Sequence, residues 1–141
     1  GHRLVADDVV KIIRVTEDRL DGSPQKYLKY FLEVRGLGIV NVKDLFGVGS
    51  TRDRKRIELA VFLEEWDIRK YYERVGFRDR LIKILGVKIP KIVIPVKPGR
   101  NITVIIEVAA MQERLRKMGY FSVVEFEDKM KKVMRSPDYK E

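Results

Sequence analysis

The sequence predicts one domain of mixed α and β structure, in which strands and helices do not alternate strictly. The chain has 141 residues, the length of a single domain that can bury its own core. Residues 57–63 alternate in apolar character like a strand, whereas apolar side chains between 104 and 118 recur in steps of three and four, like one face of a helix. With 45% hydrophobic and 36% charged residues, the chain is expected to be soluble and globular.

The amino-terminal residues are predicted to form extended structure and then a turn. Leu4-Val5-Ala6 is typical of a short buried strand, which would deliver Asp7-Asp8 at its carboxyl end. The β-branched residues in 9–15 continue the extended chain. Residues 21–24, Asp-Gly-Ser-Pro, have turn chemistry, so the chain is expected to reverse there.

Helices and a loop are expected in the middle of the chain. Residues 25–34 place aromatic side chains on one face of a helix, and Arg35-Gly36-Leu37-Gly38 would end it with glycine in a left-handed cap. A short helix is predicted over 42–46. The loop 47–51, Gly-Val-Gly-Ser-Thr, is not a P-loop because no Gly-Lys-Ser/Thr follows, so a flexible lid or a plain loop is expected. A helical turn or two is predicted over 67–75.

The carboxyl-terminal half is predicted to contain strands followed by two helices. Residues 80–96 favour a strand in two pieces, bent at Pro90. Asn101 can cap a long helix, and Ser122 with Glu125 forms a capping-box pattern for the last helix. The apolar stripes of these helices consist of Val104, Val108, Met111, Leu115 and Met118, and of Val123, Phe126, Met130 and Val133.

Charge and composition narrow the classes of function. The 30 Lys and Arg exceed the 21 Asp and Glu by nine, which points to a polyanionic partner: nucleic acid, an anionic membrane or a phosphorylated ligand. The absence of cysteine excludes disulfides and thiolate chemistry, and the single His2 argues against a catalytic triad or a multi-histidine zinc site. No apolar run approaches the roughly 20 residues of a membrane span. A cytoplasmic protein is expected.

Carboxylates and glycines in the first half are candidate parts of a phosphoryl-transfer site. A strand that ends in Asp7-Asp8 is where nucleotide enzymes hold Mg²⁺ and orient a nucleophile, although two solvated turn aspartates would give the same pattern. Glu33 precedes Arg35-Gly36-Leu37-Gly38, where glycine would let a metal–phosphate group approach closely. The alternative there is a helix cap beside a surface glutamate.

Basic residues in the second half form a second candidate site. The stretch 67–100 contains ten Lys and Arg against three acids, which suits nucleic acid or a phosphate but also an ordinary solvated surface. Residues 95–101 form a stiff loop before a helix, where Lys97 and Arg100 could bind an anion. A mere connector is the alternative. His2 and Trp66 are predicted to be structural.

Several long stretches resemble one family, and they occur in the family's order. The most specific is Leu-Glu-Val-Arg-Gly-Leu-Gly-Ile-Val-Asn-Val at 32–42. Residues 1–8, 95–100 and 105–111 agree as well. Over residues 1 to about 130 the chain therefore resembles the catalytic domain of HPr kinase/phosphorylase.

This resemblance implies an activity and a fold. Such enzymes use Mg²⁺ and ATP or pyrophosphate to phosphorylate a serine of HPr, a phosphocarrier protein, and remove that phosphate by phosphorolysis, which regulates carbon catabolite repression. The implied fold is a P-loop α/β kinase domain similar to phosphoenolpyruvate carboxykinase, with carboxyl-terminal helices. The implied assembly is a hexamer that binds neither nucleic acid nor membranes.

The resemblance also assigns roles by position. Asp8 matches the catalytic aspartate, Asp7 a Walker-B-like neighbour, Glu33 the magnesium ligand, and Arg74 the catalytic arginine of a Tyr-x-Arg-x-Gly pattern. Arg35, Gly36 and Gly38 would lie at the nucleotide. The dephosphorylation loop corresponds to Pro95, Val96, Lys97, Pro98, Gly99 and Arg100, with lysine at 97 where arginine is common.

The family's P-loop and amino-terminal domain are not in the 141 residues, so these residues alone are expected neither to bind ATP normally nor to phosphorylate HPr. Three alternatives stay open at this point: a nucleic-acid-binding module, a non-catalytic interaction domain that docks through its last two helices, and a kinase of another substrate on the same fold.

Overall fold

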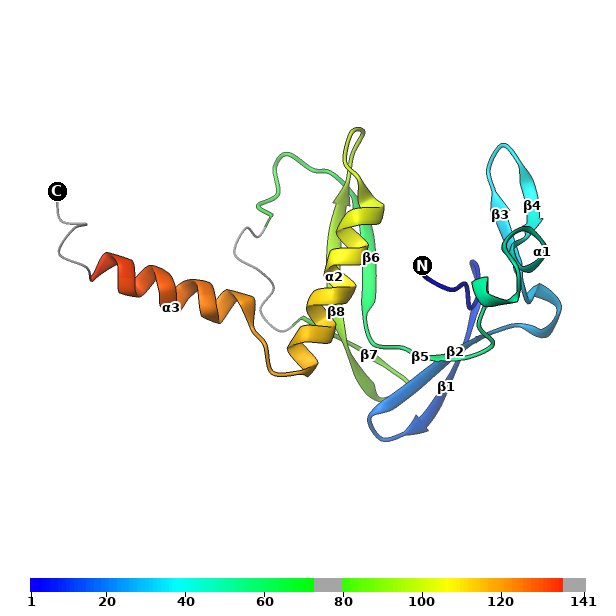
Figure 1. The fold of residues 1–141 in the computed structure, drawn as a ribbon, viewed down its shortest axis with the longest axis horizontal. Coiled ribbons are helices and arrows are strands. Elements are labelled where there is room, and N and C mark those ends of the chain that lie inside the picture. The colour runs from blue at the N-terminus through cyan, green and yellow to red at the C-terminus, as the bar shows by residue number, and fades with distance from the viewer. Residues whose placement is uncertain (73–79, 136–141) are drawn as a thin grey trace. The chain divides into compact units, whose positions relative to one another are not determined.

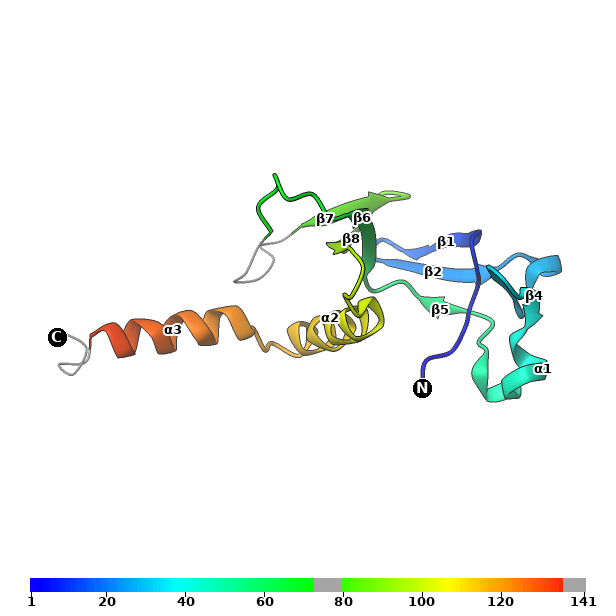
Figure 2. The ribbon, with the colours of Figure 1, turned by 90° about the horizontal axis from the view of Figure 1, so that it is seen from above.

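The computed structural model describes residues 1–72 and 80–135, and the chain divides into two compact units (Figures 1 and 2). Unit 1 comprises residues 1–58 and 81–89, and unit 2 comprises 59–80 and 90–141. The mixed α/β class predicted from the sequence is confirmed. Each unit has strands of its own.

Unit 1 is built on an antiparallel sheet of three strands in the order β1-β2-β5. These are β1 (Val10–Thr16), β2 (Arg19–Pro24) and β5 (Lys55–Arg56). The β1 strand confirms the extended structure predicted there, but the turn predicted at 21–24 is wrong. The chain reverses at Glu17-Asp18 instead, and Gly22 lies inside β2 opposite Ile12. Glycine fits there because a Cβ would come within 3.2 Å of the Val10 side chain.

The helix predicted over 25–34 is also wrong. Only a 3₁₀ turn, η1 (Lys26–Leu28), forms there, and the chain then enters a hairpin of β3 (Phe31–Val34) and β4 (Gly38–Asn41). Gly36 and Gly38 do have left-handed φ values of 91°, but they belong to the hairpin turn rather than to a helix end. The α1 helix (Val42–Phe46) confirms the short helix expected there, and η2 (Val48–Ser50) follows it.

Strand β8 (Val87–Val96) runs through both units. It pairs with β7 (Leu81–Ile84) on one side and in parallel with β6 (Ala60–Glu65) on the other. The break predicted at Pro90 lies at Leu85-Gly86, a two-residue hairpin turn in which both φ values are positive. Leucine is unusual in such a turn, so local sequence could not predict the hairpin. Strand β6 begins three residues later than predicted.

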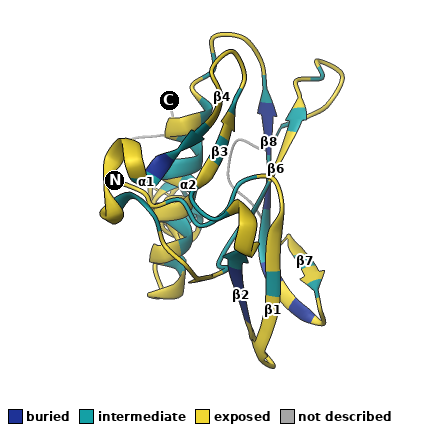
Figure 3. Ribbon diagram, turned by 90° about the vertical axis from the view of Figure 1, so that its right-hand side faces the viewer, coloured by how far each residue is buried: buried dark blue, intermediate teal, exposed yellow. Residues whose placement is uncertain are grey.

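The alternation of buried positions along β8 shifts by one residue near Pro90. Val87 and Ile89 are buried in the first part, whereas Ile92 and Ile94 are buried in the second (Figure 3). Because successive side chains of a strand face opposite sides, this shift of one residue means that β8 buries different faces in its two halves. The boundary between the units falls at the same point.

Two helices complete unit 2. Asn101 caps α2 (Ile102–Lys117) by accepting a hydrogen bond from the Val104 N–H at 3.2 Å, as predicted. The capping box at the start of α3 (Ser122–Met134) does not form, because Phe121 is the cap residue and Glu125 pairs with Lys129 instead. The predicted stripe of α2 is real but 44–65% exposed, because the opposite face lies over Ile92. Within the described ranges, no helix is long and apolar enough to cross a membrane.

The buried acid of unit 1 is Asp21, whose side chain is 3% exposed in the centre of the three-stranded sheet. Arg19 donates two hydrogen bonds to its carboxylate, at 2.8 and 3.1 Å, and Arg54 donates a third at 2.7 Å. The hydrogen bonds from Arg19, and after them the bond from Arg54, hold the pKa of Asp21 below its ordinary value. Burial acts in the opposite direction and raises this pKa. The ion cluster therefore joins β2 to the segment that precedes β5.

Asp21→Asn is expected to lower the melting temperature by several degrees at neutral pH, because one negative charge between two arginines is lost. Since folding lowers the pKa of Asp21, its contribution to stability is complete above the unfolded value near 3.8 and disappears as the pH falls through the folded value. The difference in melting temperature should therefore shrink at acid pH. Asp44→Asn, at an exposed position of α1, is the control. A difference that stays constant down to the lowest pH would contradict the prediction.

Candidate functional site

The structure brings Asp7, Asp8 and Glu33 to the wall of one cavity in unit 1, with a volume of about 360 Å³. The rest of the wall consists of Tyr27, Leu28, Phe31, Leu32 and Ile39. Glu33 is exposed on β3, and its backbone N–H donates to Asp7 Oδ2 at 3.0 Å. Sequence reasoning named all three carboxylates, but it placed Glu33 on a helix. The strand brings them together because β3 lies directly beside Asp7.

Asp8 occupies an unusual backbone conformation. Its φ is 56°, in the left-handed region, and the Val9 N–H donates to the Asp7 carbonyl at 2.6 Å across it. This three-residue turn is rare and strained for residues other than glycine, and such strain is concentrated at functional sites. The turn ends the extended segment and directs the neighbouring carboxylates of Asp7 and Asp8 into the same cavity.

The aspartates are positioned by backbone hydrogen bonds to a distant loop. The predicted strand at 4–6 is only a single bridge between Leu4 and Thr51. The Leu4 N–H donates to the Ser50 carbonyl at 2.9 Å, and the Arg52 N–H donates to the Leu4 carbonyl at 2.8 Å. The Gly-Val-Gly-Ser-Thr loop is therefore an anchor for the aspartate segment, which agrees with the plain-loop alternative and not with a free lid.

The carboxylates fit a magnesium ion that is shared with a phosphate. Within residues 1–72 and 80–135, no three acidic or imidazole side chains converge to form a complete ligand set. Mg²⁺ in phosphoryl-transfer sites commonly takes one or two carboxylates and completes its shell with water and phosphate oxygens. Asp7, Asp8 and Glu33 supply oxygen ligands of that kind beside an open cavity.

Arg35, Gly36 and Gly38 lie at the turn of the β3–β4 hairpin and do not line this cavity. The Leu37 N–H donates to the Val34 carbonyl at 3.0 Å, which closes the turn around Gly36. A Cβ on either glycine would meet no atom of residues 1–72 and 80–135 within 4 Å. The left-handed φ values therefore explain both glycines.

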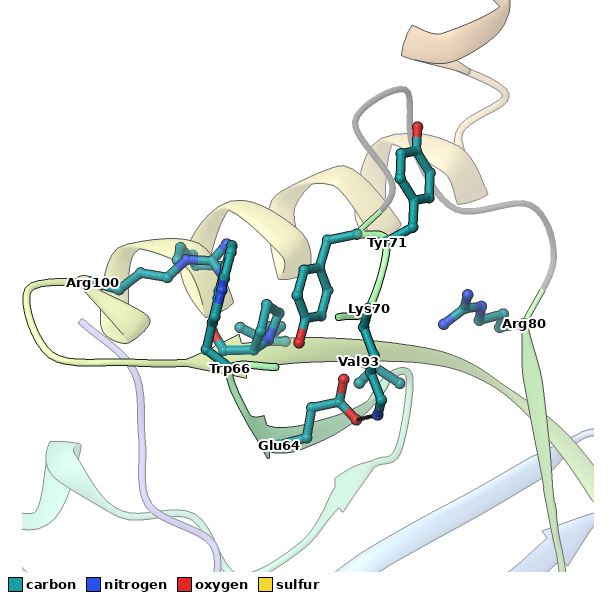
Figure 4. A pocket seen from close by; sticks show the side chains of 11 residues that line it. Glu64, Trp66, Lys70, Tyr71, Arg80, Val93 and Arg100 are labelled. Atoms are coloured by element: carbon teal, nitrogen blue, oxygen red, sulfur yellow. Dashed lines mark hydrogen bonds and ion pairs between the residues drawn. The ribbon is translucent and has the colours of Figure 1, made fainter. Parts of the chain in front are cut away.

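The basic loop 95–100 lies within unit 2. Pro95 and Val96 end β8, and the loop closes when Arg100 donates from its guanidinium to the Pro95 carbonyl at 2.7 Å. Figure 4 shows Arg100 beside Trp66. Both side chains line a cavity of about 690 Å³. Lys70 also lines the cavity and donates to Glu64 at 3.2 Å. Of the helical turn or two predicted over 67–75, residues 67–72 form one turn, in which the Lys70 N–H donates to the Asp67 carbonyl at 3.0 Å. Residues 73–75, Arg74 among them, lie outside the described residues.

Sequence reasoning treated Trp66 only as a structural residue. Its ring centroid lies 4.4 Å from Lys97 Nζ and 5.5 Å from Arg100 Cζ, so it contacts both cations of the loop. The available signal was its position three residues after the predicted strand at 57–63. Nothing local showed that this strand pairs with the one that leads into the basic loop.

Comparisons with known proteins identify the family of the chain. The sequence model described as HPr Serine kinase C-terminal domain matches residues 1–130. An HPr kinase/phosphorylase of Thermoanaerobacter sp. (strain X514) is 52% identical over 132 residues, which are 94% of this chain and 43% of that protein. One from Leptospira biflexa is 56% identical, over 92% of this chain and 41% of that protein. The chain thus spans less than half the length of these curated relatives.

A solved structure also resembles this fold. The structure of the Hpr(Ser) kinase/phosphatase from Coxiella burnetii matches with a TM-score of 0.77 and 31% identity, over 89% of this chain and 76% of that one. The matching sequence model defines the class of protein: the chain is a carboxyl-terminal domain of the serine-kinase type. The chain belongs to the HPr serine kinase C-terminal domain family, as the resemblance in its sequence indicated.

The left-handed turn at Asp8 can be tested by unfolding in urea. Asp8→Gly is expected to be more stable than Asp8→Ala by about 1 kcal/mol, because glycine adopts a left-handed φ without a steric cost. The same pair of substitutions at Asp44, inside α1, should show the opposite order, because alanine favours helices. Equal stability of the two variants at position 8 would show that this residue is not held in the left-handed region.

Proposed function

We propose that the protein is a bifunctional HPr kinase/phosphorylase. In one direction it transfers a phosphoryl group from ATP or pyrophosphate to a serine of HPr, and in the other it removes that group with inorganic phosphate, releasing pyrophosphate. The observation that carries the proposal is the cavity with Asp7, Asp8 and Glu33 in a chain of this family. The setting would be cytoplasmic carbon catabolite repression.

Asp8 is the proposed acid and base. Its carboxylate accepts the proton of the serine hydroxyl as that oxygen attacks the phosphoryl donor, and it returns the proton to the serine in the reverse direction. Asp7 is the neighbouring Walker-B-like carboxylate, and the Glu33 N–H fixes one of its oxygens. A defined position of the carboxylates matters because the base must lie within hydrogen-bond distance of the proton that it accepts in the transition state.

Glu33 is the proposed ligand of Mg²⁺, with Asp7 and Asp8 beside it. The bound ion would neutralise phosphate charge. Arg35, Gly36 and Gly38 are proposed to adjoin the nucleotide, and Arg74 with the loop Pro95–Arg100 would stabilise phosphoryl oxygens. The proposal includes a P-loop α/β fold similar to phosphoenolpyruvate carboxykinase, completed by segments outside these 141 residues, and a hexameric assembly without nucleic acid.

The proposed function is tested with the full-length protein that carries this sequence. It is incubated with HPr, ATP and Mg²⁺, and phosphoserine on HPr is measured by mass spectrometry. Asp8→Ala should reduce phosphorylation about 10²-fold or more, because general-base catalysis is lost. Asp44→Ala, at an exposed position in the same unit, should remain active. Absence of phosphoserine from a folded wild-type protein that binds nucleotide would mean that HPr is not the substrate.

The metal role of Glu33 predicts a separate effect. Glu33→Gln keeps the size of the side chain but removes its charge, so the Mg²⁺ concentration for half-maximal activity should rise about tenfold or more. The backbone N–H that Asp7 accepts is retained, so melting should change little. Titration of activity with Mg²⁺ measures the effect, with Glu17→Gln at the exposed β1–β2 turn as the control. An unchanged Mg²⁺ requirement would exclude Glu33 as a ligand.

A further inference from the structure

Trp66 is fixed beside the basic loop by the backbone. Strands β6 and β8 pair in parallel from Ala60 opposite Lys91 to Glu65 opposite Val96. One residue beyond this ladder, the Trp66 N–H donates to the Val96 carbonyl at 2.9 Å. The backbone of Trp66 is thereby joined to the residue that precedes Lys97.

The ring of Trp66 contacts both cations of the loop. Lys97 Nζ lies 4.4 Å and Arg100 Cζ 5.5 Å from the ring centroid, both within the range of cation–π attraction. Arg100 is also tied to the Pro95 carbonyl, and its backbone N–H donates to the Lys97 carbonyl at 3.2 Å. The loop is therefore held as a compact turn with its two cations close to one aromatic ring.

A second aromatic residue fixes the indole. The centroids of the Trp66 and Tyr72 rings are 4.6 Å apart with an angle of 37° between their planes. The Tyr72 hydroxyl accepts a hydrogen bond from the Asp67 N–H at 2.8 Å, which fixes the phenol ring in turn. Trp66 is still 39% exposed, so it is not an ordinary core residue.

An aromatic ring positions a cation without cancelling its charge. In the described part of the chain, neither Lys97 nor Arg100 forms an ion pair with a carboxylate, so their positive charge stays available to a ligand. A carboxylate in place of the indole would fix the same groups but compete with any anion. An uncharged platform that holds two cations suits the binding of a small, multiply charged anion such as phosphate.

We propose that Trp66 is a positioning residue, which holds Lys97 and Arg100 ready for the inorganic phosphate used in phosphorolysis. This proposal rests on the proposed function. It adds Trp66, a residue outside the loop, and assigns to it an effect on phosphorolysis. Transfer from ATP to the serine does not use inorganic phosphate, so it should depend much less on Trp66.

The test measures both directions with the full-length protein. Trp66→Leu should raise the KM for phosphate in the dephosphorylation of phosphoserine-HPr about tenfold, while kcat for phosphorylation with ATP changes less than about twofold. Trp66→Phe keeps an aromatic face and should remain within about threefold of the wild type. An equal loss in both directions, or a loss in Trp66→Phe as large as in Trp66→Leu, would overturn the positioning role.

A double-mutant cycle links the effect to the cation. In a Lys97→Met background, Trp66→Leu should raise the KM for phosphate clearly less than it does alone, because one cation that the ring positions is already gone. Full additivity of the two effects would contradict the proposal. Binding of phosphate is also followed by isothermal titration, which needs no turnover. A wild type that binds phosphate more tightly than Trp66→Leu but does not act on HPr would support the role of Trp66 and reject the proposed substrate.

Discussion

The parallel pairing of β6 with β8 is the constraint on which unit 2 depends. It sets Glu65 opposite Val96, and the Trp66–Val96 hydrogen bond then extends it to the start of the basic loop. Because side chains alternate along a strand, a slip of one residue in this register would turn Ile92 and Ile94 out of the core and move Trp66 away from Lys97. The same backbone contacts thus determine both the core and the placement of the cations.

Unit 1 positions its carboxylates in a comparable way. Leu4 is held by two backbone hydrogen bonds to the loop after α1, and Asp7 accepts a third from β3. The partners lie 26 to 48 residues apart in sequence, so the aspartates depend on the closure of the whole amino-terminal half. Within residues 1–72 and 80–135, the Asp8 carboxylate forms no hydrogen bond or ion pair, and the backbone at Asp8 is left-handed.

The sequence predicted the elements whose signals are local. Asn101 before an apolar stripe and the β-branched run in β1 were sufficient, because capping and strand preference act over a few residues. The turn predicted at Asp21-Gly22 is wrong because contacts with Arg54 and Ile57 override the turn preference of these residues. Both partners lie more than 30 residues away, so local sequence does not reveal them. Residues 25–34 were misinterpreted because their pairing with β4 decides the structure. The acidic residues of the site could be named, but not the cation platform, since the contact of Trp66 with Lys97 exists only after β6 and β8 pair.

Two kinds of contact position basic residues in this chain: ion pairs with a carboxylate and cation–π contacts with an aromatic ring. The two kinds differ in how much positive charge they neutralise. Arg19 and Arg54 share the single buried carboxylate of Asp21, which neutralises part of their charge. Lys97 and Arg100 rest against an indole, which attracts cations through its quadrupole and adds no negative charge. A net charge of +9 alone does not locate an anion site, because solvated and paired cations contribute to it equally. Lys91 also lies over the ring of Phe62, and Lys29 and Lys43 lie over Tyr30, where Lys29 pairs with Asp53 as well. We propose Lys97 and Arg100 as the phosphate-binding cations because both share one ring and neither pairs with a carboxylate within residues 1–72 and 80–135.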